Sequence, residues 1–352
     1  MFRRAGLGPL LLAMFLGPVG ASAQQHNSPA QPANTSIHLD VVVTAKSGPP
    51  VTDLERQDFN LLDNNAPQPI TSFQVISGRQ APIEVVVVID AVNAAYQTVA
   101  FERSEIGKFL QAEGGHLAYP VALAIFTDKS TEILGGQFST DGNALNAALN
   151  QEDVGLRFIQ RSSGYYGATE RLQLSLQALN QIVDSEMPRP GRKIILWVSP
   201  GWPLLSGPNT MLDSKQQQQI FGDIVGISTK LRRARVTLYS INPAGTNESL
   251  SRASYYQEFV KGVSKPNQVN IGNLGLQVLA VQTGGLALDL SNDLTSSLRQ
   301  CLSDVAPYYE ISFNSPPAER PNEYHRIEIK LAKSGLTART RQGYYAQPSP
   351  SN

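Results

Sequence analysis

The run Val85-Val86-Val87-Val88-Ile89, which ends at Asp90, decides the fold. It is apolar without alternation, as is typical of strands covered on both faces in parallel sheets. Apolar runs of the same design recur at residues 121–126, 194–198 and 236–241. Because apolar residues at helical spacing lie between these runs, we expect an α/β domain over residues 82–305. Its predicted core is a doubly wound, mostly parallel sheet.

Both ends of this region have β character. Ile37, Leu39, Val41 and Val43 alternate with more polar positions, which predicts a strand with one buried face. Isolated pieces of two or three strands are marginally stable. We therefore expect residues 37–80 and 306–346 to pair into one small β-sandwich into which the α/β domain is inserted.

The first residues resemble a targeting segment. Arg3 and Arg4 precede a broken apolar stretch that is too short to span a bilayer, and Ala21-Ser22-Ala23 fits a cleavage site. We interpret residues 1–23 as a signal peptide. The predicted mature protein is exported to a periplasmic or extracellular space and has no transmembrane anchor.

Polar, low-complexity composition predicts a disordered leader at residues 24–36, and residues 347–352 form a short tail. The 352 residues include 29 Lys+Arg and 29 Asp+Glu. Without a basic stripe to neutralise phosphates, nucleic acid is an unlikely class of partner. The single cysteine, Cys301, excludes an internal disulfide and a thiolate metal cage.

Polar residues follow the predicted parallel strands, where open α/β sheets bind ligands. They are Asp90, Asp128, Ser199 and Asn242. With these residues the chain resembles the von Willebrand factor A family, in which an Asp-x-Ser-x-Ser motif, a loop Thr and a later Asp hold a divalent cation. Asp90 matches the first ligand, and Thr169 matches the loop threonine.

The resemblance is incomplete at the metal site. Val92 and Ala94 stand at the two serine positions, and Pro200 stands where the later acidic ligand is expected. Asn93 offers an oxygen from an unexpected position. Since Mg²⁺ or Ca²⁺ requires six or more oxygen ligands, we expect a vestigial metal site at Asp90 and Thr169 and keep an atypical working site as the alternative.

The likeness extends to VWFA-related proteins of acidobacteria, from Ile37 to Ala346. It rests on residues 41–51 near the start and on residues 324–330 and 341–345 near the end. This resemblance implies export, a von Willebrand factor A-like core and no established catalytic activity.

Aromatic residues stand near the predicted strand ends. Tyr165, Tyr166 and Trp202 are candidates to contact a partner together with Asn93 and Ser199, because aromatic residues contribute much of the energy of interfaces. The alternative is that they cap the core.

We therefore predict a non-enzymatic binding module for a protein or peptide ligand. A metal-dependent adhesion module is the first alternative. A hydrolase that uses Asp90 and Asp128 is the second, although the chain lacks the Gly-x-Ser-x-Gly, phosphate-loop and His-Glu-x-x-His motifs.

Overall fold

A computed structural model describes most of the chain. The described residues are 36–45, 48–78, 82–152, 164–203, 212–243, 255–289 and 293–348. The predicted signal peptide, all but the last residue of the leader, and the end of the tail lie outside them. No helix within these ranges is long and apolar enough to cross a membrane.

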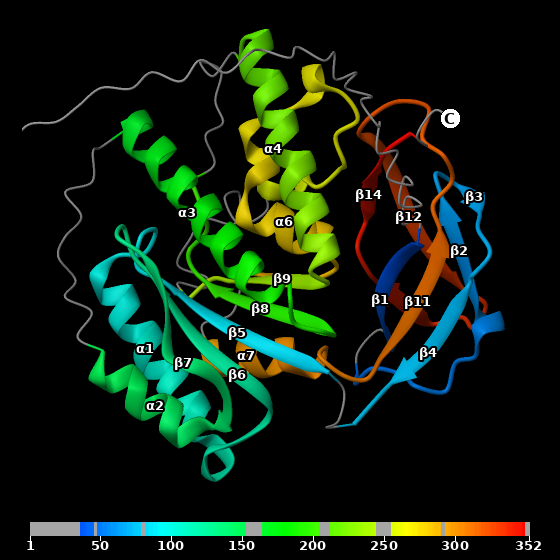
Figure 1. The fold of residues 1–352 in the computed structure, drawn as a ribbon. Coiled ribbons are helices and arrows are strands. Elements are labelled where there is room, and N and C mark those ends of the chain that lie inside the picture. The colour runs from blue at the N-terminus through cyan, green and yellow to red at the C-terminus, as the bar shows by residue number, and fades with distance from the viewer. Residues whose placement is uncertain are drawn as a thin grey trace, which may run out of the picture. The chain divides into compact units, whose positions relative to one another are not determined.

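The fold is mixed α/β, with one six-stranded mixed sheet and two four-stranded antiparallel sheets (Figure 1). The six-stranded sheet has the order β10-β9-β8-β5-β6-β7. Its strands are β5 (Ile83–Asp90), β6 (His116–Phe126), β7 (Thr131–Asp141), β8 (Arg192–Val198), β9 (Val236–Ile241) and β10 (Ala287–Leu288). All neighbours are parallel except β6 and β7. The antiparallel edge strand β7 was not expected from the sequence.

Helices cover both faces of this sheet, which explains the unbroken apolar run in β5. Val86 and Val88 face a cluster shared with three helices, and Val85, Val87 and Ile89 face the opposite cluster. The first group of helices is α3 (Gly164–Glu186), α4 (Ser214–Arg233) and α6 (Leu276–Gln282). The second is α1 (Tyr96–Gln111), α2 (Gly142–Gln151) and α7 (Leu294–Ser303), and α7 carries the buried Cys301.

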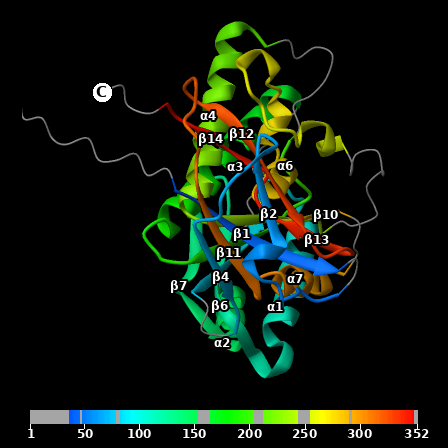
Figure 2. The ribbon, with the colours of Figure 1, turned by 90° about the vertical axis from the view of Figure 1, so that its right-hand side faces the viewer.

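The two antiparallel sheets combine strands from both ends of the chain. One has the order β13-β1-β11-β4 and the other β14-β12-β2-β3. Figure 2 shows β1 and β11 side by side, and Ile37 pairs with Phe313. The strands are β1 (Ser36–Ala45), β2 (Phe59–Asp63), β3 (Ala66–Pro67), β4 (Ser72–Ile76), β11 (Tyr308–Asn314), β12 (Glu323–Leu331), β13 (Leu336–Arg339) and β14 (Gly343–Ala346).

One apolar core joins these two sheets. Leu39 and Ile311 from the first sheet share a buried cluster with Leu61 and Ile327 from the second. A polar group is buried in the same region. Asp63 accepts hydrogen bonds from the Tyr344 hydroxyl at 2.6 Å and contacts His325 Nδ1 at 2.9 Å. The second sheet therefore links β2, near the start of the chain, to β12 and β14, near its end.

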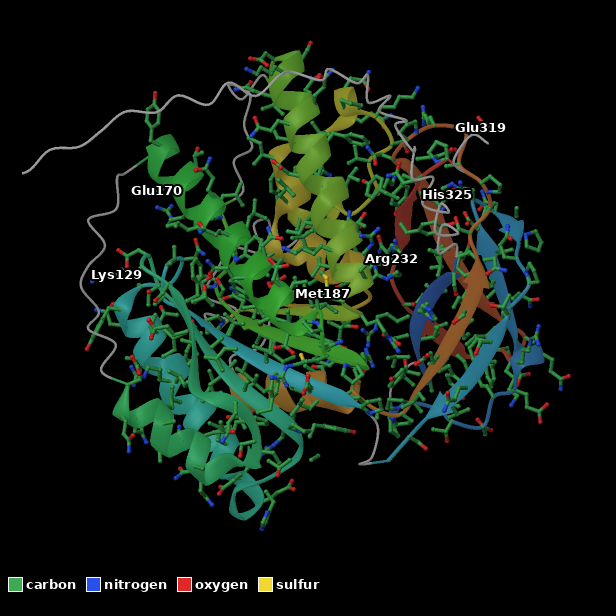
Figure 3. All side chains as sticks on the ribbon, in the orientation of Figure 1. Lys129, Glu170, Met187, Arg232, Glu319 and His325 are labelled. Carbon is green, nitrogen blue, oxygen red and sulfur yellow. The ribbon has the colours of Figure 1, made fainter. Side chains whose placement is uncertain are left out.

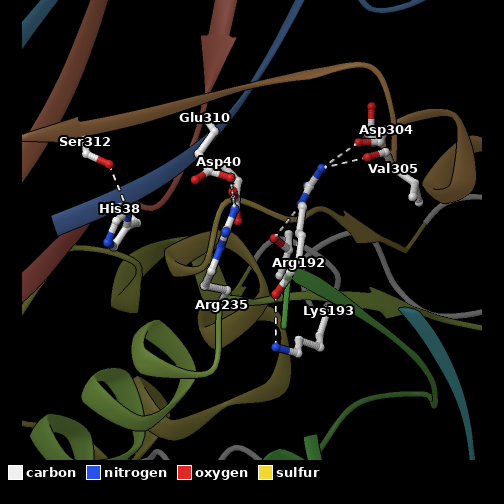
Figure 4. A network of polar contacts seen from close by, with 11 residues as sticks. His38, Asp40, Arg192, Lys193, Arg235, Asp304, Val305, Glu310 and Ser312 are labelled. Carbon is white, nitrogen blue, oxygen red and sulfur yellow. Dashed lines mark hydrogen bonds and ion pairs between the residues drawn. The ribbon is translucent and has the colours of Figure 1, made fainter. Parts of the chain in front are cut away.

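Two arginines link the six-stranded sheet to β1, to β11 and to the segment that precedes β11. Arg192, at the start of β8, donates to the carbonyl oxygens of Asp304 and Val305 at 3.0 and 3.1 Å. Arg235, before β9, contacts Asp40 and Glu310 at 2.5 and 2.6 Å (Figure 4). Since Asp40 lies on β1 and Glu310 on β11, Arg235 joins both ends of the chain to the α/β region.

We predict that a cavity in the shared core destabilises strands from both ends of the chain. Ile311→Ala removes a fully buried side chain of β11 and is expected to lower the free energy of unfolding by about 2–5 kcal/mol. The control Val75→Ala, at a 37% exposed position, should cost less than about 1 kcal/mol. Hydrogen exchange should show lost protection in β1 as well as in β11. Unchanged protection in β1 would contradict a shared core.

Candidate functional site

The candidate site lies at the edge of the six-stranded sheet where the parallel strands end, here called the carboxyl edge. Asp90 ends β5, Ser199 follows β8 and Asn242 follows β9. All three are buried, and Asp90 and Ser199 are 0% exposed. The parallel register brings Ile89 opposite Val198, and Val198 opposite Ile241, so these three polar residues lie close together.

Hydrogen bonds from the protein surround the Asp90 carboxylate. Its Oδ1 accepts from the backbone N–H groups of Val92 and Asn93 at 3.0 and 2.9 Å. Its Oδ2 accepts from Asn93 Nδ2 at 2.8 Å and from Trp197 Nε1 at 3.0 Å. A carboxylate has about four lone-pair sites, so protein donors occupy the positions that a cation would use.

Asn93 is held in turn by helix α3. Its Nδ2 also donates to Ser175 Oγ at 2.9 Å, and Ser175 donates to the Arg171 carbonyl at 2.7 Å. The Asn93 Oδ1 atom is buried and has no hydrogen-bond partner among the described residues. The amide that the sequence analysis considered as a metal ligand therefore has its nitrogen, not its oxygen, directed at Asp90.

Glu102 is a second buried carboxyl group near Asp90, and it was not among the residues predicted from the sequence. It lies on α1, is 0% exposed, and neither of its carboxyl oxygens has a hydrogen-bond partner in the described part of the chain. Burial raises the pKa of Glu102 well above its usual value, and the negative charge of Asp90 adds to this effect. The sequence contains a signal for its burial, because helical spacing places Glu102 on the same face of α1 as the apolar residues Val99, Ile106 and Phe109.

Burial also raises the pKa of Asp90, and the hydrogen bonds from Asn93 and Trp197 oppose that shift. Asp90 has these donors, whereas Glu102 has none. Asp90 is therefore the carboxyl group of this pair that the fold equips to carry a charge.

The predicted aromatic residues have different environments. Trp202 is 3% exposed and packs edge-on against Trp197, with ring centroids 5.1 Å apart, so it belongs to the core. Tyr166 is 82% exposed.

We expected Tyr165, Tyr166 and Thr169 in a loop, but α3 already begins at Gly164. A glycine such as Gly167 is tolerated inside a helix at a cost of about 1 kcal/mol. The side chain of Tyr165 lies outside the described residues.

Two exposed tyrosines flank the carboxyl edge. Tyr96 starts α1 and is 54% exposed, and Tyr166 lies in the first turn of α3. These helices cover opposite faces of the sheet. Because α1 follows β5 and α3 precedes the parallel strand β8, both helices begin at the carboxyl edge. In Figure 3, Glu170 marks this end of α3 and Met187 the other end.

The hydrogen bonds described for Asp90 involve neither Thr169 nor Asp128. Thr169 is partly buried on α3, and Asp128 is exposed in the turn between β6 and β7. Within the described ranges, no three His, Cys, Asp or Glu side chains cluster closely enough to hold a metal ion.

No protein-family model matches the chain, and no curated protein matches it. Solved structures give weak likenesses. The mussel byssus proximal thread matrix protein 1 is 11% identical with a TM-score of 0.37, and the match covers 67% of this chain and 50% of that one. The chain thus spans about half the length of the mussel protein.

Two further structures have similar values. The manganese-loaded TRAP protein of Plasmodium vivax is 8% identical with a TM-score of 0.36, and the match covers 83% of this chain and all of that one. The pilus adhesin SpaC of Lactobacillus rhamnosus GG is 10% identical with a TM-score of 0.34, with 88% of this chain and 42% of that one covered. At these scores we base no conclusion on the likeness.

We predict that Asp90 is needed for stability. Asp90→Ala leaves several buried donors without an acceptor, at about 1–3 kcal/mol each. The free energy of unfolding should therefore fall by at least about 3 kcal/mol in urea titrations. The control Asp128→Ala, at an exposed turn, should change it by no more than about 0.5 kcal/mol. Equal effects of the two substitutions would contradict a structural role for Asp90.

Glu102 predicts a pH dependence of stability. Because its pKa is raised in the folded state, the folded protein holds this proton more tightly than the unfolded chain does. The stabilisation is complete below the unfolded pKa, near 4.5, and is lost as pH rises toward the folded pKa. The Gln side chain of the Glu102→Gln variant cannot ionise, so the variant does not lose this stabilisation as the pH rises. Its unfolding free energy should match wild type near pH 4 and exceed it at pH 8.

The control for this pH series is Glu113→Gln, which changes an exposed carboxylate just after α1. It should follow the wild-type pH profile. A Glu102→Gln profile parallel to wild type between pH 4 and 8 would contradict the prediction.

Proposed function

We propose that the protein is a secreted, non-enzymatic binding module. The carboxyl edge of a von Willebrand factor A-like domain contacts a protein or peptide ligand directly, without a metal ion. The antiparallel sheets formed by both chain ends serve as its base. The observation that supports this most is the hydrogen-bonded state of Asp90: the residue that would hold a cation in that family is engaged by donors of the chain itself.

The rim of the carboxyl edge supports direct contact with a protein. Tyr96 and Tyr166 place large, partly apolar side chains in solvent on either side of the buried Asp90 group. Tyrosine buries a large area at low entropic cost and is enriched among residues that dominate binding energy. A rigid buried group below exposed aromatics is a suitable frame for such contacts.

The metal-dependent alternative requires Asp90 to exchange these hydrogen bonds for a cation. Mg²⁺ or Ca²⁺ would also need several more oxygen ligands, and Val92 and Ala94 provide no side-chain oxygen. The hydrolase alternative pairs Asp90 with Asp128. At least one member of a hydrolytic carboxylate pair must reach the substrate or a water molecule, and Asp90 is 0% exposed.

The proposal predicts which surface residues retain the ligand. The full mature chain is immobilised and exposed to the exported proteins of its source cells. The double variant Tyr96→Ser/Tyr166→Ser should capture at least about tenfold less of the retained partner, since loss of an aromatic anchor costs about 2 kcal/mol or more. The matched control is Met187→Ser, a 38% exposed apolar residue at the opposite end of α3.

Chelation separates this proposal from the metal-dependent alternative. Capture by the wild-type chain should be the same with and without EDTA. Capture that EDTA abolishes would support the metal-dependent alternative. Equal capture by the double variant and by Met187→Ser would contradict the carboxyl edge as the binding surface.

A further inference from the structure

Six strands form the edges of the three sheets in the described part of the chain: β3, β4, β7, β10, β13 and β14. An edge strand exposes backbone N–H and C=O groups to which a further strand can bond. Natural proteins block such edges with short strands, prolines, irregular register, charges or covering elements. β3 and β10 have two residues each, and β3 contains Pro67. β7 has shifts of register against β6 and positive φ angles at Gly135 and Gly136, so these three edges are poor templates for another strand.

Other contacts protect two more edges. β14 packs against α4, where the Phe221 and Tyr345 rings lie edge-to-face with centroids 6.0 Å apart. β13 carries Arg339, whose guanidinium bonds to the Asp304 carboxylate and to the Gly284 carbonyl oxygen. A charged side chain on an edge strand also opposes pairing with another strand.

β4 has none of these protections. Its residues, Ser72-Phe73-Gln74-Val75-Ile76, include no charge, no proline and no glycine. Its register against β11 runs without a break, and Figure 1 shows β4 beside β11 at the border of the sheet. Every second residue of an edge strand directs its N–H and C=O groups outward. No strand among the described residues bonds to this outer side of β4.

The side chains of β4 fit a strand of the same sequence. Phe73 and Val75 lie on one face of the strand. Phe73 packs against the core aromatics Phe59 and Tyr309, with ring centroids 5.4 and 5.7 Å away, but Val75 is 37% exposed. If two copies of β4 run antiparallel about Gln74, Val75 of one copy lies opposite the partner's Phe73. The exposed valine is then covered, and no like charges meet.

We propose that two copies of this chain form a symmetric dimer through their β4 strands, which pair antiparallel about Gln74. The contact joins the two sheets that contain β4 into one continuous antiparallel sheet. A single short strand buries less surface than the standard interface of about 1,600 Å², so the dimer is reversible and depends on protein concentration. β4 and Asp90 belong to different sheets, and this inference therefore does not depend on the proposed function.

Analytical ultracentrifugation of the mature chain measures the dimer. The wild-type chain should sediment as monomer and dimer, with a dimer fraction that rises with concentration. Val75→Lys places a charge on the outer edge and should raise the dissociation constant at least about tenfold. The matched control is Met187→Lys, which changes a 38% exposed apolar residue on α3 and should leave dimerisation unchanged. A wild-type chain that stays monomeric up to its solubility limit, or a dimer that Val75→Lys does not weaken, would overturn the proposal.

Cysteine substitutions test the register. The proposed two-fold axis places the two Gln74 residues opposite each other, where Cα atoms are about 4.5–5.5 Å apart, within reach of a disulfide. Gln74→Cys should therefore give a covalent dimer on a non-reducing gel after mild oxidation. Ser72→Cys, also exposed on β4, lies opposite the partner's Ile76 and should stay monomeric on the gel. The native Cys301 is buried. Equal cross-linking of the two variants would overturn the antiparallel pairing about Gln74.

The double variant Tyr96→Ser/Tyr166→Ser separates the dimer contact from the proposed binding surface. It alters the carboxyl edge and leaves β4 intact, so it should dimerise with the wild-type dissociation constant. Loss of the dimer in this variant, together with a wild-type dimer in Val75→Lys, would place the contact at the carboxyl edge and overturn its assignment to β4.

Discussion

Burial of β5 on both faces is the constraint on which the rest of the structure depends. A strand with the sequence Val85-Val86-Val87-Val88-Ile89 has no side that can face water, so helices must cover both faces of its sheet. The neighbours of β5 are parallel to it, so β5, β6 and β8 end at one edge of the sheet. Asp90, as the last residue of β5, is therefore placed inside the protein, where a charge must be hydrogen-bonded.

The surroundings of Asp90 follow from that requirement. Trp197 supplies an indole N–H from the neighbouring strand, and Asn93 supplies its backbone and side-chain N–H groups. These donors stabilise the same carboxylate that would otherwise bind a cation. Glu102, a short distance away on α1, receives no such donors, and its raised pKa reflects this. Of these two neighbouring buried carboxyl groups, the fold therefore supplies hydrogen-bond donors to Asp90 but, among the described residues, not to Glu102.

At the other side of the α/β region, arginine side chains need hydrogen-bond acceptors in the same way as Asp90 needs donors. Arg235 has acceptors on β1 and β11, and Arg192 has the carbonyl oxygens of Asp304 and Val305, between α7 and β11.

Local patterns in the sequence determined the mixed α/β class, the mostly parallel strands and the position of Asp90 at a strand end, because apolar periodicity and the alternation of strands with helices are set by neighbours along the chain. They did not reveal β7, whose sequence lacks a clear apolar alternation, or the early start of α3. The donors to Asp90 and the burial of Trp202 and Glu102 were decided only by the tertiary structure. Each of these depends on side chains far apart in the sequence, and their hydrogen bonds and desolvation exist only once the sheets and helices have packed.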